Sequence, residues 1–177
     1  MEGSRNRTEG ERFCSDRQDL GCNPGDHLRA RSVPVNRSNT IRPILVSIYL
    51  ARAYADLGKI DDAWRCIGEA TAAIEMTKQK WCEAEVNRVA GEITLMSPES
   101  DTAKAQEYFE HALAVARQQQ AKSWELRAAM SMARLWRDQG KCNAARDLLA
   151  PVYNWFTEGF DTCDLKEAKA LLGALAS

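Results

Sequence analysis

The chain has 177 residues, of which 45% are apolar and 28% charged, a length and balance typical of one globular domain. Its 24 lysines and arginines oppose 25 aspartates and glutamates, for a net charge of −1, so no overall charge attracts it to nucleic acid or to an anionic membrane. No apolar run approaches the roughly 20 residues that a membrane-spanning helix needs. We therefore expect neither nucleic acid nor a membrane as a partner.

Residues 1–40 differ in composition from the rest of the chain. Arg, Asn, Ser, Asp and Gly dominate, and Pro24-Gly25 and Val33-Pro34 interrupt any helix. Such a segment cannot bury enough apolar surface to offset the entropy that it loses on ordering, so we predict a disordered leader. The segment lacks the apolar core of a secretory signal, and we therefore expect a cytoplasmic protein.

From Ile41 onwards the chain is rich in good helix formers, and apolar residues recur at helical spacing. The first helix is expected to end at Gly58, because glycine tolerates the left-handed conformation that follows many helices. The second helix is expected to begin near Asp61. Its buried stripe is predicted at Ala63, Ile67, Ala70 and Ile74. Further helices are predicted across residues 83–96, 102–119, 123–139, 143–156 and 164–175.

Small residues recur at fixed intervals and indicate an internal repeat. Ala63, Ala105 and Ala145 lie near the start of three predicted helices, 42 and 40 residues apart. The aligned small residues of the preceding helices are Ala51, Gly91 and Ala133. A small residue lets two antiparallel helices approach closely. We therefore predict an all-α fold for residues 41–177, with three antiparallel helix pairs and a C-terminal capping helix.

Two stretches resemble the turn of the tetratricopeptide repeat and its flanking residues. They span residues 52–63 and 135–145, and each has Gly-Lys at the turn, Gly58-Lys59 and Gly140-Lys141. The period of 40–42 residues exceeds the family's usual 34, and Thr94 stands where an aromatic residue is usual. The resemblance implies a tetratricopeptide-like α-α superhelix.

Residues 81–177 are also similar to the extreme C-terminal region of bacterial adenylate/guanylate cyclase-type signalling ATPases, which are multidomain regulators. The most specific motif is Trp-Phe-Thr-Glu-Gly-Phe-Asp-Thr at residues 155–162. Cys163 follows it, where such regions usually have proline. The resemblance implies a bacterial, cytoplasmic regulatory tail. The chain has no Gly-x-x-x-x-Gly-Lys-Ser/Thr phosphate loop, so nucleotide hydrolysis is not carried over.

Residues that could support catalysis or metal binding are scattered. The six cysteines are all at least eight positions apart, which argues against a zinc site built from close pairs. His27 falls in the leader, and His111 is expected to form an exposed pair with Glu107 one turn away. Cys66 and Cys82 have no histidine close in sequence that could activate a thiolate. We therefore expect no catalytic residue, no metal and no cofactor, and predict that the chain is not an enzyme.

The strongest candidate for a binding surface is the inner face of the repeat stack, which the first helix of each pair lines in such folds. The residues predicted to bind a partner there are Arg52, Arg88, Glu92, Arg127, Met130, Arg134 and Arg137. Arginine offers a planar fork that suits carboxylates, so an acidic or helical peptide is the expected partner. The alternative is that these charges only solvate the surface, as we also expect of the acids Glu83, Glu85 and Glu92.

The function that follows is a non-catalytic protein–protein interaction or scaffolding module, expected to be a detached regulatory tail. The alternative is an inactive remnant of a nucleotide-cyclase or ATPase-type regulator with no independent function. Self-association is a further expectation, because a repeat stack exposes an apolar face at its end. The residues expected at that end are Ile41, Ile44 and Leu45.

Overall fold

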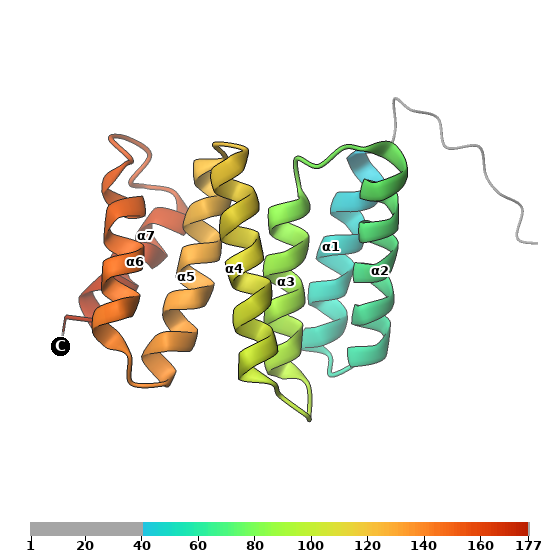
Figure 1. Cartoon of the computed structure of the whole chain (residues 1–177), viewed down its shortest axis with the longest axis horizontal. Helices are drawn as coiled ribbons and strands as arrows, with labels where there is room; N and C mark the ends of the chain where they lie inside the picture. The colour runs from blue at the N-terminus through green and yellow to red at the C-terminus, as the bar shows by residue number, and fades with distance from the viewer. Residues whose placement is uncertain (1–40, 177) are drawn as a thin grey trace, which may run out of the picture. The chain divides into compact units, whose positions relative to one another are not determined.

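A computed structural model describes the backbone of residues 41–176 and the side chains of residues 44–176, all within the unit Val35–Ser177. This part of the chain contains helices and no strand (Figure 1), which confirms the all-α prediction. The helices are α1 Ile41–Asp56, α2 Ile60–Thr77, α3 Glu83–Met96, α4 Thr102–Gln118, α5 Lys122–Asp138, α6 Cys142–Asn154 and α7 Cys163–Ala174. The predicted disordered leader, residues 1–40, lies outside the described residues.

The helix boundaries follow the sequence signals closely. Helix α3 has the predicted bounds, and most other ends differ by one residue. The largest difference is at the end of α6, which we expected at Phe156 and which lies at Asn154. Thr162 stands at the N-cap position of α7, but its hydroxyl donates to the carbonyl of Gly159 instead of capping the helix.

Two of the tight turns use glycine as the sequence indicated. Gly58 after α1 and Gly140 after α5 have φ values of 73° and 77°. After α1, the amide of Lys59 donates to the carbonyl of Tyr54 at 2.8 Å, and the amide of Gly58 donates to the carbonyl of Ala55 at 2.9 Å. This is the Schellman arrangement, which satisfies the last carbonyls of a helix. These short turns reverse the chain and make consecutive helices antiparallel.

Consecutive helices pack in pairs, α1 with α2, α3 with α4 and α5 with α6. Figure 1 shows these pairs side by side in chain order. Helix α3 also contacts α1 and α5, and α5 contacts α7. The first helices of the three pairs therefore form a continuous row, and α7 follows them at its end.

The small residue Gly91 allows α3 and α4 to pack closely, as the repeat alignment predicted. The ring of Phe109 from α4 lies so near that a Cβ atom at position 91 would meet its Cε1 at 2.5 Å. Phe109 is fully buried. The glycine thus makes room for the largest side chain of the core at this point.

The buried residues form two main clusters, one around α1, α2 and α3 and one around α4 to α7. The predicted stripe of α2 is buried as expected. The expectation that Ile44 lies on an exposed end is wrong: Ile44 is completely buried between α1 and its neighbours, and Leu45 is partly buried. Among the described residues, none of the helices combines the length and apolar character required to cross a bilayer.

Candidate functional site

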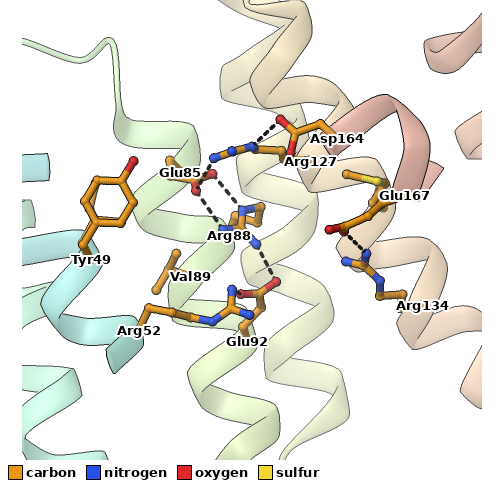
Figure 2. A pocket seen from close by; sticks show the side chains of 12 residues that line it. Tyr49, Arg52, Glu85, Arg88, Val89, Glu92, Arg127, Arg134, Asp164 and Glu167 are labelled. Carbon is orange, nitrogen blue, oxygen red and sulfur yellow. Dashed lines mark hydrogen bonds and ion pairs between the residues drawn. The ribbon is translucent and has the colours of Figure 1, made fainter. Parts of the chain in front are cut away.

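A pocket of about 280 Å³ lies where α1, α3, α5 and α7 approach one another. Figure 2 shows its lining side chains, which come from all four helices. Six of the seven predicted partner-binding residues line it. The lining residues are Ile48, Tyr49, Arg52, Glu85, Arg88, Val89, Glu92, Arg127, Met130, Arg134, Asp164 and Glu167.

Arg88 lies at the centre of the pocket wall and is bound by two glutamates of its own helix. Its Nε and Nη2 donate to the two carboxylate oxygens of Glu85 at 2.7 and 2.8 Å, and its Nη1 donates to Glu92. These partners lie one turn away on either side, the spacing at which helical side chains meet. Ser131 of α5 also donates to Glu92, at 3.0 Å. Each of the three nitrogens of the buried Arg88 guanidinium thus donates to a carboxylate.

The ion pairs continue beyond α3 and join the four helices. Arg127 of α5 donates to Glu85 at 3.2 Å and to Asp164 of α7 at 2.8 Å, while Arg52 of α1 donates to Glu92. Charges of opposite sign therefore alternate across the pocket wall. We call this series the charge ladder; in spatial order it consists of Arg52, Glu92, Arg88, Glu85, Arg127 and Asp164.

Two arginines of the charge ladder, Arg88 and Arg127, have raised pKa values. Burial lowers the pKa of Arg88, but the hydrogen bonds and charges of Glu85 and Glu92 outweigh it, and the net pKa is raised. The same balance raises the pKa of Arg127: burial lowers it, and the hydrogen bond with Asp164 and the charge of Glu85 raise it by more. The guanidinium of Arg127 also lies 5.4 Å from the ring centroid of Trp124, within cation–π range.

Arg134 has a different setting from Arg88 and Arg127, whose guanidinium groups each hold more than one partner. Arg52 resembles Arg134, since its side chain is 49% exposed and donates one hydrogen bond within the described part of the chain, to Glu92. The Nη2 of Arg134 donates to Glu167 of α7 at 2.9 Å, and this is its one hydrogen bond among the described residues. Its side chain is 40% exposed. Because a guanidinium has five N–H donors, Arg134 keeps donors that a ligand in the pocket can use.

The rest of the pocket is apolar or aromatic. Ile48, Val89 and Met130 are buried and form its floor, one from each of α1, α3 and α5. Tyr49 is 66% exposed and stands on the α1 side, away from the ion pairs (Figure 2). Because the three floor residues are almost completely covered, the surface that the pocket presents is mainly charged.

The structure corrects three expectations about these residues. Arg137 does not line the pocket; it lies one turn beyond Arg134, and its guanidinium contacts Asp138 at the surface. Glu85 is not on a solvated face, because its side chain is 7% exposed and holds Arg88. The prediction had also treated the arginine forks as open to a partner. Those of Arg88 and Arg127 are instead occupied by carboxylates of this chain.

Sequence reasoning missed the contribution of α7 to the pocket. Asp164 and Glu167 lie one turn apart at the start of this helix and bind Arg127 and Arg134. Their spacing of three residues shows that they share a face of α7. The sequence alone does not predict that this face of α7 packs against α5.

The other residues considered for catalysis lie elsewhere. His111 is exposed and lines another pocket, of about 290 Å³, together with Glu107. Cys66 and Cys82 are buried free thiols, and burial raises the pKa of Cys82 to about 11. Within residues 44–176, no three His, Cys, Asp or Glu side chains group so that they could hold a metal ion.

Comparisons with models of protein families, with curated proteins and with solved structures find no match to this chain. The resemblance to tetratricopeptide repeats and to the ends of cyclase-type signalling ATPases therefore stays a prediction.

Proposed function

We propose that this chain is a non-catalytic helical-repeat module that binds a peptide segment of a protein partner in the pocket between α1, α3, α5 and α7. The observation that carries the proposal is the convergence of side chains from three successive pairs and α7 on one pocket with an apolar floor. In this proposal the paired helices form a tetratricopeptide-like superhelix, and the chain acts as a cytoplasmic scaffold or regulatory tail of a bacterial signalling protein.

The charges of the rim define the kind of peptide that fits. Four arginines and four carboxylates line the pocket, so they balance and do not favour a strongly acidic ligand. A single carboxylate is favoured at Arg134, which has donors to spare. Ile48, Val89 and Met130 are already covered, so they add little contact surface for a ligand. We therefore propose a peptide with a single acidic residue.

A selection experiment tests this proposal directly. The full chain is immobilised, a random peptide library is selected on it, and the dissociation constants of enriched peptides are measured by fluorescence anisotropy. Arg134→Glu is expected to weaken binding at least tenfold, because it removes the free donors and repels the carboxylate. Loss of a charged hydrogen bond of this kind is worth about 1.5–3 kcal/mol.

Arg137→Glu is the matched control. It changes the same residue type on the same helix, with 41% of the side chain exposed, but outside the pocket. Affinity should be unchanged by this control. Equal losses with both variants would show that general surface charge, not the pocket, holds the peptide. If no peptide is enriched on a folded chain, the alternative of an inactive remnant becomes the better account.

A further inference from the structure

The outer face of α1 carries an exposed apolar row with a regular spacing. The row consists of Val46, Leu50, Ala53 and Leu57, separated by four, three and four residues. Val46, Leu50 and Leu57 are exposed by 52%, 44% and 71%. Leu57 continues the helical row, because its amide donates to the carbonyl of Ala53 at 3.1 Å. We call these four residues the α1 seam; spacings of four and three are those of a coiled-coil interface.

Equivalent positions in the other repeats are buried. With Ala51, Gly91 and Ala133 aligned, three seam positions correspond to Val86, Ala90 and Ile93 in α3 and to Ala128, Met132 and Leu135 in α5. All six of these residues are buried. Those of α3 form one cluster with residues of α1 and α2, the pair that covers them. In α3 and α5, the helix face that corresponds to the α1 seam is therefore covered by neighbouring helices.

At the opposite end of the helix row, the large exposed apolar side chains are Trp155 and Phe160, which lie between α6 and α7 and not on α7 itself. The exposed positions of α7 include Lys166, Glu167 and Lys169, a polar face of the kind that caps a repeat stack. Head-to-tail stacking of copies would place the apolar seam against these charges. Apolar surface contacts apolar surface only if the α1 seams of two copies pack against each other. A two-fold symmetry axis generates this arrangement.

We infer that the α1 seam binds the α1 seam of a second copy of this chain, with the two helices antiparallel. The spacing of four, three and four residues is the same from either end of the helix. In an antiparallel pair, Val46 therefore faces Leu57 of the second copy, and Leu50 faces Ala53. Large residues meet small ones at the centre, where the helices approach most closely.

The residues that flank the seam suit this arrangement. Tyr49 and Asp56 lie along one edge of the row, seven residues apart, and both are exposed. In the antiparallel pair this edge meets the same edge of the second copy, so the hydroxyl of Tyr49 faces the carboxylate of Asp56 and can donate to it. Like charges do not face one another. A single helix pair buries less than the roughly 1,200 Å² of a standard interface, so we expect a weak, micromolar dimer.

Sedimentation equilibrium of the full chain tests the inference between about 1 and about 200 μM. The mass is expected to rise with concentration towards twice 19.8 kDa. Leu50→Glu should remain monomeric throughout, with unchanged helical circular dichroism. Met76→Glu is the control, since Met76 is 71% exposed on α2 and lies outside the seam; it should dimerise as the parent does.

A mixing experiment tests the antiparallel register. Val46→Glu and Leu57→Lys should each prevent self-association. A mixture of the two should form a heterodimer, because Glu at position 46 then faces Lys at position 57 while the other contact stays apolar. A parent chain that is monomeric at every concentration, or a dimer that survives Leu50→Glu, would overturn the inference. Failure of the mixture to associate would overturn the antiparallel arrangement.

Discussion

Glu85 and Arg88 of α3 form a buried ion pair that also contacts α5. Their side chains are 7% and 10% exposed, and Glu85 also receives a hydrogen bond from Arg127 of α5. Buried charges of this kind need their partners, because a charge left unpaired in the interior keeps the full cost of its desolvation. We therefore assign Arg88 and Arg127 a structural role and leave partner binding to Arg134 and Arg52, whose side chains are 40% and 49% exposed.

Replacement of Glu85 should cost far more stability than replacement of a surface acid. Glu85→Ala leaves Arg88 buried with Glu92 as its one remaining carboxylate, and we expect a loss of about 3 kcal/mol in the free energy of unfolding. Asp138→Ala removes the exposed partner of Arg137 and should change it by less than about 0.5 kcal/mol. Urea unfolding followed by circular dichroism measures both. Similar losses in the two variants would contradict the buried role of Glu85.

Glu125 should make stability depend on pH in the acid range. Burial raises the pKa of this carboxyl, but the hydrogen bonds from Lys122 at 2.7 Å and Arg117 at 2.9 Å outweigh it, so its pKa lies below the ordinary 4.5. A lowered pKa contributes stability above about pH 4.5, and this contribution disappears as pH falls through the pKa of the folded state.

Glu125→Gln isolates this contribution. At neutral pH the variant should unfold at lower urea concentration than the parent. The difference should shrink as the pH falls well below 4.5, because the parent's carboxyl is then protonated as well. A difference that stays constant over the whole acid range would show that the ion pairs of Glu125 contribute nothing.

At the scale of the elements, close approach of α3 and α4 depends on Gly91. An alanine at this position would normally favour the helix by about 1 kcal/mol. Here its Cβ would meet the buried ring of Phe109, and overpacking of a core costs about 1–3 kcal/mol. The repeat alignment had identified Gly91 as a small-residue position, but the identity of its neighbour comes from the structure.

Gly91→Ala should therefore lower the free energy of unfolding by about 1–2 kcal/mol. The control is Gly68→Ala in α2, where no heavy atom lies within 4 Å of the added Cβ. This control should stabilise the protein by about 0.5–1 kcal/mol, since it removes glycine from an exposed helix position. Thermal unfolding measures both effects: the unfolding temperature should fall in Gly91→Ala and rise in Gly68→Ala. Stabilisation by Gly91→Ala would refute the packing argument.

Most helices could be predicted from the sequence because their signals are local. The stops at Gly58 and Gly140, and the apolar stripe of α2, depend on residues that are neighbours in the chain. The end of α6 was less accurate, because Trp155 and Phe156 are apolar but lie outside the helix. The periodicity of apolar residues continues there beyond the point where the hydrogen bonds of the helix end.

At the scale of the whole molecule, the repeat alignment predicted which positions share a face but not what each side chain contacts. It grouped Arg52, Arg88 and Arg134 correctly in one pocket. The alignment included Arg137, and the expectation of a solvated acidic face left Glu85 to solvent, because a helical face is wide and only packing decides which of its residues are buried. The carboxylates of α7 could not be foreseen, since their position depends on how the last helix packs against α5.

The measurement that tests the central proposal most directly is a chemical-shift map of the full chain with a peptide from the selection. The account predicts that amide shifts change in α1, α3, α5 and α7 around Arg52, Val89 and Arg134, with α2 and α4 almost unaffected. Changes that gather on α2 and α4, or along the α1 seam, would place the binding site elsewhere and contradict the proposed function of the pocket.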